Sequence, residues 1–292
     1  MTIQPTHTQT SVDSVLEKTI KDIGIPPRPV IIDRIVAEMR KEEPDFHYLG
    51  HLIEADVSLS ASLIKMANSP YFGFHARARS IHEALTMLGL NVTSRAIAGL
   101  SLRRAFPPSP RLERFWHASA EIAALAGWLA RTVEIPKLRV DETYTYGLFR
   151  DCGIPVLLRR FPEYHLTLDR ANNEAELSFP EIELQEFPVD HAMIGCLLAQ
   201  DWWLPHEICL AIRSHHDRQA LDLHDSGLPL VSRYMIAAGQ TAEYIIQRVT
   251  RQSHTCEWGK LGESCMRLLD INEAQVEDFC TQAVEVLKTV ER

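Results

Sequence analysis

Two consecutive helical patterns between Phe187 and Asp217 constrain the fold most, because each carries a histidine on an otherwise apolar face. The first repeats at three- and four-residue spacing, through His191, Ile194, Leu198 and Trp202. The second has the same spacing, through Ile208, Ala211, Ile212 and His215. Pro205 separates the two patterns and suits the first turn of a helix, where no backbone hydrogen bond is lost. The chain is therefore expected to turn two imidazoles toward the interior of a helical fold.

Three further side chains could join these imidazoles from other parts of the chain. They are His117 in FWHASAEIA, Asp151 in YGLFRDCGIPVLL, and His216 beside His215. Any one buried histidine is most simply a core residue with satisfied hydrogen bonds, since histidine is intermediate in burial among residue types. Neutral imidazoles and a carboxylate that converge from separate helices, however, are the ligands that a divalent metal site in a helical bundle requires.

The order of these residues resembles the HD superfamily of metal-dependent phosphohydrolases, whose pattern is a helix histidine, a His-Asp pair, further histidines and a final aspartate. Two positions depart from that pattern. Arg150-Asp151 stands where the family has His-Asp, and the late helix reads Ala238-Gly239-Gln240, without the expected carboxylate. An arginine stays protonated and cannot give a lone pair to a metal. We therefore expect no bound metal, and we expect the Arg150 guanidinium to take the place of a metal and to pair with Asp151.

The chain as a whole predicts an all-α fold. From Val12 onward nearly every segment has a helical period, and no run alternates as a half-buried strand would. A first helix over about 12–23 should end at Gly24, and three prolines within Phe106–Pro110 mark a boundary because they cannot continue a helix. The expected organisation is a disordered tail over 1–11, a helical subdomain over 12–108, a second subdomain over 109–250, and C-terminal helices over 251–292 that pack on the bundle.

Three strings in the first half of the chain carry a second resemblance. They are IPPRP over residues 25–29, EADVSLSASLIKMANSPYFG over residues 54–73, and SIHEALTMLGLN over residues 80–91. These strings are similar to the amino-terminal half of the HDOD family, the HD-related output domains of bacterial signalling proteins. The resemblance covers roughly residues 20–220. It implies a multi-helix bundle of HDOD type with an HD-like second half, and a regulatory rather than a catalytic role.

A segment rich in aromatic and basic residues is the best candidate for a ligand or partner loop. Its candidate contacts are Tyr71, Phe72, Arg77 and Arg79, together with Asn68 just before them. Aromatic rings interleaved with arginines can stack on bases and hold phosphates. Asn68 can instead have an architectural role as a left-handed helix cap, and a solvated surface with local salt bridges is the simpler interpretation of the arginines.

Composition narrows the classes of partner and compartment. The net charge of −9 argues against non-specific binding to nucleic acids or anionic membranes, which requires concentrated lysine and arginine. Six cysteines include no CxxC pair and mostly fall within apolar helical patterns, as reduced core residues do. The longest apolar run, Ile122–Ala130, is too short to cross a bilayer, and the first residues lack the features of a secretory signal. We expect a cytoplasmic chain without a cofactor.

Three functions remain open on these grounds. We favour a non-enzymatic signalling protein that acts in trans on partners such as kinases, receiver or cyclic-dinucleotide proteins, with homo-oligomers allowed. Its eroded polar cluster would fix the geometry of the core or bind a small anionic effector, and comprises His117, Arg150, Asp151, His191, His215, His216 and Gly239. The alternative is a metal-dependent phosphohydrolase with an altered ligand set, acting on a cyclic dinucleotide or phosphate ester through one metal. A nucleic-acid-binding regulator that uses the 71–79 segment is the third.

Overall fold

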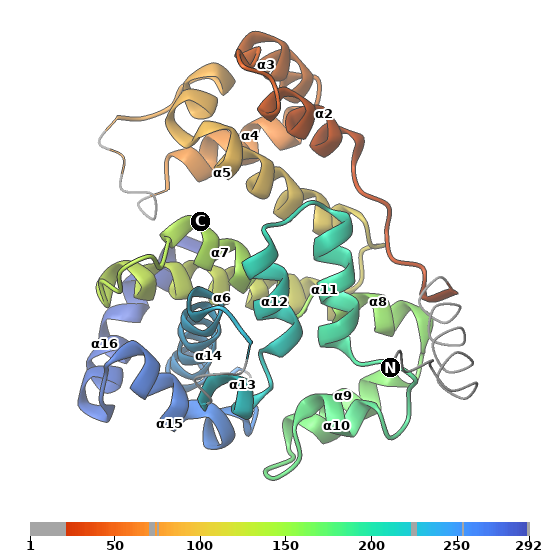
Figure 1. Cartoon of the computed structure of the whole chain (residues 1–292), viewed down its shortest axis with the longest axis vertical. Helices are drawn as coiled ribbons and strands as arrows, with labels where there is room; N and C mark the ends of the chain where they lie inside the picture. The colour runs from red at the N-terminus through yellow and green to blue at the C-terminus, as the bar shows by residue number, and fades with distance from the viewer. Residues whose placement is uncertain (1–21, 70–73, 75, 223–226, 253, 291–292) are drawn as a thin grey trace, which may run out of the picture.

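The computed structural model describes residues 22–69, 74, 76–222, 227–252 and 254–290, and within these ranges it contains helices and no strand (Figure 1). The all-α fold expected from the sequence is confirmed. The helix expected over 12–23 lies almost wholly outside the described residues, but Gly24 has the left-handed φ of 76° that such a stop requires.

The first group consists of four helices, three of which are capped by side chains at their N-termini. It comprises α2 (Val30–Met39), α3 (Phe46–Glu54), α4 (Val57–Ala67) and α5 (Ile81–Arg104). Asp45, Asp56 and Ser80 each accept a hydrogen bond from a backbone N–H in the first turn of α3, α4 and α5, as good N-caps do. Gly89 interrupts α5 with a φ of 71°, so the helix kinks there.

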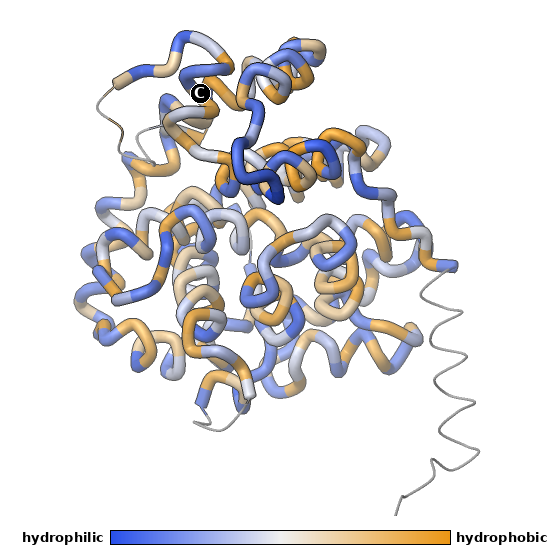
Figure 2. Tube along the Cα trace, turned by 45° about the horizontal axis from the view of Figure 1, so that its top comes forward, coloured by the Kyte–Doolittle hydropathy of each residue, from blue (hydrophilic) through white to orange (hydrophobic). Residues whose placement is uncertain are grey.

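The second group forms the larger part of the molecule. Its helices are α6 (Pro110–Thr132), α7 (Val140–Phe149), α8 (Gly153–Arg160), α9 (Tyr164–Asn172), α10 (Phe179–Glu183), α11 (His191–Asp201), α12 (His206–Ser214), α13 (Arg218–Asp222), α14 (Leu230–Thr250), α15 (Glu257–Leu269) and α16 (Glu273–Val290). Helix α6 packs against α7, α14 and α16, and Leu125, Ala126 and Leu129 on it are fully buried. Apolar and polar stretches alternate along most helices in Figure 2, as expected for helices with one buried face.

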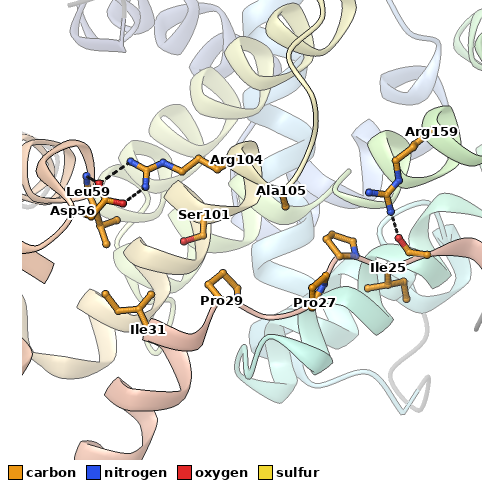
Figure 3. A pocket seen from close by; sticks show the side chains of 12 residues that line it. Ile25, Pro27, Pro29, Ile31, Asp56, Leu59, Ser101, Arg104, Ala105 and Arg159 are labelled. Atoms are coloured by element: carbon orange, nitrogen blue, oxygen red, sulfur yellow. Dashed lines mark hydrogen bonds and ion pairs between the residues drawn. The ribbon is translucent and has the colours of Figure 1, made fainter. Parts of the chain in front are cut away.

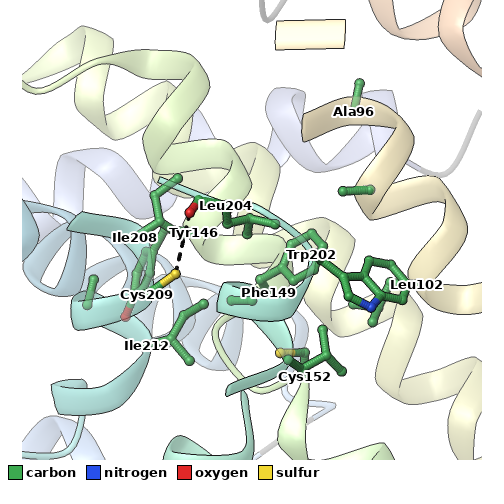
Figure 4. Close-up of a cluster of buried hydrophobic side chains, with 14 of the residues drawn as sticks. Ala96, Leu102, Tyr146, Phe149, Cys152, Trp202, Leu204, Ile208, Cys209 and Ile212 are labelled. Carbon is green, nitrogen blue, oxygen red and sulfur yellow. Dashed lines mark hydrogen bonds between the residues drawn. The ribbon is translucent and has the colours of Figure 1, made fainter. Parts of the chain in front are cut away.

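The proline-rich connector ties the two groups of helices together. It runs extended from Gly24 to α2, and the carbonyl oxygen of Pro26 accepts a hydrogen bond from the indole Nε1 of Trp202 at 3.0 Å. Trp202 is 1% exposed and packs edge-on against Phe149, with ring centroids 6.4 Å apart (Figure 4). The C-terminal end of α11 is thereby joined to both the connector and α7.

Other expectations concern single residues. All six cysteines are free, and Cys152, Cys196, Cys209 and Cys265 are buried. None of the helices in the described ranges has the length and hydropathy needed to span a bilayer.

Asn68 ends α4 with φ −86° and ψ −2°, which is right-handed, so the expectation of a left-handed cap was wrong. Its side-chain amide instead bonds both ways to the backbone of Ala78, at 2.8 Å each, and this pairing closes the segment between α4 and α5.

A close crossing of α8 and α11 brings the turn after α7 against the start of α11. A Cβ atom on Gly153 would lie 2.0 Å from the carbonyl oxygen of His191 and 2.8 Å from the amide nitrogen of Gly195. Those neighbours are backbone atoms of a helix and cannot move independently. Glycine at 153 therefore permits Asp151, two residues earlier, to lie next to His191.

We predict that Gly153→Ala lowers the free energy of unfolding by about 1–3 kcal/mol, because the added methyl group forces two helices apart. Gly259→Ala is the matched control, since a Cβ there meets nothing within 4 Å and removal of a helical glycine stabilises by about 0.5–1 kcal/mol. Urea unfolding followed by circular dichroism measures both. Equal stabilities for the two variants would contradict the close crossing.

Candidate functional site

Four side chains from three places in the chain meet inside the larger group of helices. One ligand atom from each of Asp151, His191, His215 and His216 lies within 4.8 Å of the others. Asp151 lies in the turn between α7 and α8, His191 begins α11, and the paired histidines directly follow α12. The Asp190 carboxylate caps α11 by accepting a hydrogen bond from the Met193 N–H at 2.6 Å, which fixes His191 in the first helical position. We call these four residues the histidine cluster.

The three imidazoles of the histidine cluster point their Nε2 atoms at one another. His191 Nε2 lies 3.3 Å from His215 Nε2 and 3.2 Å from His216 Nε2. The Asp151 Oδ1 atom lies 3.2 Å from His215 Nε2 and 3.6 Å from His191 Nε2. All three histidines are buried, and the Asp151 side chain is 19% exposed.

The other ring nitrogen of each histidine faces an acceptor. His191 Nδ1 lies 2.8 Å from Glu183 Oε2, His215 Nδ1 lies 2.7 Å from the Ile212 carbonyl oxygen, and His216 Nδ1 is bonded to Glu257. A carbonyl or carboxylate can only accept, so Nδ1 carries the proton in each neutral ring and the Nε2 lone pairs face the centre. Such outer acceptors orient metal-bound histidines in proteins.

Buried charges decide the protonation of the histidine cluster. Burial alone would lower the pKa of His191, but Glu183 and Asp151 raise it to about 10. Burial lowers the pKa of His215, and it lowers that of His216 to about 3. Burial alone would raise the pKa of Asp151, but Arg150, His191 and His215 hold it well below its usual range. One positive charge therefore sits among three imidazoles, on the ring that has carboxylates on two sides.

The donor set fits a single divalent cation. Ligand atoms around a tetrahedral zinc ion with bonds of about 2.0–2.1 Å stand about 3.3–3.4 Å apart. Four separations within the histidine cluster are 3.2–3.6 Å, and all its ligand atoms lie within 4.8 Å of one another. Three imidazoles with fixed tautomers and one carboxylate are also a suitable chemical set for zinc or a similar ion. The sequence-based expectation of no metal rested on the missing ligand at position 150, and it stays a prediction.

Arg150 is buried beside the histidine cluster, with a side chain only 2% exposed. Its Nη2 donates to Glu243 Oε2 at 2.9 Å and to Gln240 Oε1 at 3.2 Å, while its Nε lies 3.8 Å from Asp151 Oδ2. Burial alone would lower the pKa of Arg150, but Glu243 and Asp151 raise it, so the guanidinium is permanently charged. The expected pairing with Asp151 is present as a long contact, and Glu243 is the closer partner.

Two residues assigned to the histidine cluster from the sequence lie elsewhere. The His117 side chain is 46% exposed beside Glu121. Arg111 and Phe115 carry the face of α6 that turns toward the cluster, and position 117 is two residues, or about 200°, further round the helix. A Cβ on Gly239 would lie 2.7 Å from Tyr146 Cε1, so this position faces a tyrosine ring and not the cluster.

Several functional candidates were missed because their signal is weak in the sequence. Glu183, Gln240, Glu243 and Glu257 hold the imidazoles or Arg150. Glu183 and Glu257 are almost completely buried, yet nothing in their flanking residues distinguishes them from surface glutamates. Glu243 could have been found, since it follows Gly239 by four residues and shares its side of α14.

The aromatic and basic segment after α4 is described only in part. Tyr71 and Phe72 lie outside the described residues, while Arg77 and Arg79 are exposed. Asn68 is occupied by its two hydrogen bonds to Ala78, which supports its architectural role. The nucleic-acid hypothesis for this segment stays a prediction.

Two cavities differ in their relation to the histidine cluster. The larger, of about 640 Å³, lies between the proline-rich connector, α4, α5 and α8, where Arg104 pairs with Asp56 and Arg159 donates to the Gly24 carbonyl oxygen (Figure 3). It contains no member of the cluster. The smaller, of about 210 Å³, is lined by polar residues that include Arg150, Asp151, His191 and His216 and by apolar residues that include Phe115, Leu168 and Phe179. We call the smaller one the cluster cavity and regard it as the candidate functional site.

Comparisons with known proteins bear on the family and the fold of the chain. A family model described as HDOD domain matches residues 25–218. An uncharacterised protein from Treponema pallidum (strain Nichols) is 28% identical over 179 residues, or 60% of this chain. The chain covers 35% of that relative's length.

Three solved structures share the fold at identities too low to carry more than the fold. An HDOD domain protein of unknown function from Geobacter sulfurreducens has a TM-score of 0.65 at 22% identity, with 98% of each chain covered. A Shewanella amazonensis SB2B protein assigned provisionally as a phosphohydrolase has a TM-score of 0.66 at 18% identity, over 94% of this chain and 97% of that one. A Marinobacter aquaeolei VT8 protein assigned provisionally to signal transduction has a TM-score of 0.62 at 21% identity, over all of this chain and 61% of that one.

We predict that Arg150→Met lowers the free energy of unfolding by about 3–5 kcal/mol, because it leaves Glu243 and Asp151 without their buried cation. The double variant Arg150→Met/Glu243→Leu should recover part of this loss, since it removes one unpaired charge. Arg114→Met, at an exposed position of α6, is the matched control and should stay within about 0.5 kcal/mol of the wild type. Additive effects of the two substitutions in urea unfolding would mean that Arg150 and Glu243 do not interact.

Proposed function

Because the chain belongs to the HDOD domain family, we propose that it is a cytoplasmic regulatory protein that binds other signalling proteins in trans and does not hydrolyse phosphate esters. Kinases, receiver proteins and proteins that handle cyclic dinucleotides are the kinds of partner that this role implies. The observation that carries the proposal is the buried guanidinium of Arg150 at the edge of the histidine cluster.

Arg150 supports a non-hydrolytic role through its charge. By its resemblance to the HD superfamily, the chain has Arg150 where that superfamily has a metal-binding histidine. A guanidinium offers no lone pair to a cation. Its contacts with Glu243 and Asp151 also occupy the two carboxylates that could have bound a second ion. A hydrolytic mechanism that requires two adjacent metal ions would therefore lack free carboxylates for the second ion.

The size of the cluster cavity supports the same proposal. Pockets for drug-sized ligands commonly have volumes of about 300–1,000 Å³, and the cluster cavity has about 210 Å³. A cyclic dinucleotide carries two bases, two sugars and two phosphates, so it exceeds that space. This argues against a cyclic-dinucleotide hydrolase in particular.

Exposed apolar side chains support the protein-binding part of the proposal. Val30 and Val57, at the starts of α2 and α4, are 67% and 81% exposed. Exposed apolar side chains of this kind are surface that a partner protein can cover.

A metal-dependent phosphohydrolase is the second candidate, favoured by the convergence of three imidazole Nε2 atoms and Asp151. His191, His215, His216 and Asp151 would hold the ion. A bound divalent ion would supply Lewis acidity toward a phosphoryl oxygen and a lowered pKa for a bound water molecule. In that case Glu183 and Glu257 would keep the rings oriented, and Arg150 would face the substrate.

We predict no turnover of phosphomonoesters, phosphodiesters or cyclic dinucleotides above that of free metal ions, with the protein as purified or with added Zn²⁺, Mn²⁺ or Fe²⁺. Elemental analysis of protein purified without chelator should accompany the assays, so that inactivity of a loaded site is distinguished from an empty one. Metal-dependent turnover that His191→Ala and Asp151→Ala both abolish would establish the hydrolase.

We also predict that Arg150→His raises the affinity for Zn²⁺ or Mn²⁺ by about tenfold or more, the scale of changes around a metal site, because it replaces a fixed cation by a potential ligand. Arg114→His is the control for an added surface histidine. Gly239→Asp should destabilise the protein without raising affinity, because its side chain meets Tyr146. Titration calorimetry measures the affinities, and equal values for Arg150→His and wild type would show that Arg150 does not exclude a cation.

A further inference from the structure

The larger cavity, which we call the connector groove, is a hollow between the two groups of helices. It has a volume of about 640 Å³, within the range of about 300–1,000 Å³ that is common for ligand pockets. Its apolar lining comes from the proline-rich connector, α4 and the end of α5, and includes Ile25, Pro27, Pro29, Leu59 and Ala105. Several residues at its rim, among them Pro27, are exposed. An apolar side chain from another molecule can therefore enter it.

Arginines stand at both ends of the connector groove (Figure 3). At one end Arg104 pairs with Asp56 at 2.5 Å. At the other end Arg159 donates a hydrogen bond to the Gly24 carbonyl oxygen and lies over the ring of Phe106, 5.4 Å from its centroid. No carboxylate of the described residues pairs with Arg159, so its charge is available to an anion outside the molecule.

These two arginines belong to a larger set at neighbouring helix ends, which we call the arginine patch. Its five members are all exposed, and they are Arg103, Arg104, Arg111, Arg159 and Arg160. Glu113 pairs with the first and Asp56 with the second. The other three have no ion pair with any described residue. Three positive charges are therefore unbalanced here, on a chain whose net charge is −9.

Helix stability explains only part of the arginine patch. Arg103 and Arg104 lie in the last turn of α5, and Arg159 and Arg160 lie in the last turn of α8. Cations are favourable there because of the helix dipole. Arg111 is instead the second residue of α6, where the same dipole disfavours a cation. Positive charge at the start of α6 is better explained by an anionic partner than by the helix itself.

We propose that the connector groove and the arginine patch dock an acidic segment of a partner protein. One apolar side chain of that segment enters the groove, and its flanking carboxylates pair with Arg159 and Arg160. The proposal rests on the proposed function, because it names the surface and the partner chemistry of a protein that acts in trans. Complementary charge of this kind sets the specificity and the association rate of a complex.

The position of the connector groove relates docking to the rest of the fold. Pro26 lines the groove, and its carbonyl oxygen accepts the hydrogen bond from Trp202 at the end of α11. A docked segment therefore contacts the part of the connector that α11 holds in place.

A nucleic acid fits the same surface less well. Proteins that bind single strands combine a basic groove with aromatic rings on which the bases stack. Phe106, the ring beneath Arg159, is only 5% exposed, and no aromatic side chain is among the described residues that line the groove. The apolar lining therefore favours an aliphatic side chain over a base.

A short labelled peptide with one central leucine, flanked on both sides by glutamates and aspartates, is a suitable probe. Fluorescence anisotropy with the full chain measures its binding. We expect saturable one-site binding that weakens as salt is added, because salt screens exposed charges. Replacing the leucine by serine should weaken binding by about tenfold, the scale of burying one leucine side chain. Replacing the acidic residues by lysines should abolish binding, because like charges then meet.

Two variants locate the peptide. Arg159→Glu/Arg160→Glu should weaken binding at least about tenfold, because it sets carboxylates against the carboxylates of the peptide. Lys137→Glu/Arg251→Glu is the matched control, since it makes the same change in net charge at two exposed residues that have no ion pair with a described residue. Ser101→Trp keeps every arginine and fills the groove, so it should weaken binding even if the double charge reversal fails to fold. Circular dichroism confirms that each variant is folded.

The outcomes separate this proposal from the proposed function. No saturable binding of the peptide, or equal binding by wild type and Arg159→Glu/Arg160→Glu, would overturn the docking surface and leave the non-hydrolytic role standing. Equal binding of the leucine and serine peptides would overturn it as well, because the groove would then take no part. Metal-dependent turnover of phosphate esters, with peptide binding intact, would overturn the non-hydrolytic role and leave the docking surface standing.

Two further measurements exclude other occupants of the same surface. A labelled oligouridine that binds more tightly than the acidic peptide would assign the surface to nucleic acid and overturn the proposal. Sedimentation velocity tests for a second copy of the chain. A dimer that Arg159→Glu/Arg160→Glu dissociates would show that this copy occupies the surface, and would also overturn the proposal.

Discussion

A single positive charge among three imidazoles is the requirement on which the interior of the larger helix group depends. Nε2 atoms 3.2–3.3 Å apart cannot all present lone pairs to one another without a cation, whether a proton or a metal. Glu183 and Asp151 provide the negative charge that keeps a proton on His191 when no ion is bound. The charge on His191 is shared with Glu183 at the end of α10 and with Asp151 in the turn after α7, so it ties both of these places to the start of α11.

Arg150 places a second buried positive charge beside the histidine cluster. The guanidinium is separated from the imidazoles by Asp151 and is balanced by Glu243. This arrangement explains how a permanent charge can be buried without unfolding the site, because burial of a charge is tolerated when it is paired and hydrogen-bonded. The Nε and Nη1 atoms of Arg150 are buried and have no hydrogen-bond partner among the described residues.

The sequence predicts the helices and the membership of the histidine cluster well, and its geometry less well. Period and capping residues place α11 and α12 within a few residues, and His191, His215, His216 and Asp151 meet as expected. The prediction that His117 joins the histidine cluster was wrong because each position along a helix rotates the side chain by about 100°. No local signal in the sequence fixes which face of α6 turns toward the cluster. The carboxylates that orient the rings come from α10 and α15, and the one that pairs with Arg150 comes from α14. Their approach depends on tertiary packing that helical periodicity does not encode.

Helix α11 links the candidate site to the connector between the two helix groups. His191 begins the helix inside the histidine cluster, and Trp202 follows its end and donates to the Pro26 carbonyl oxygen. An α-helix is stiff over this length of about 16 Å, so a ligand that shifts His191 also shifts the point at which the connector is held. In the regulatory role proposed above, this helix would be a direct physical route from the histidine cluster to the connector that leads into α2.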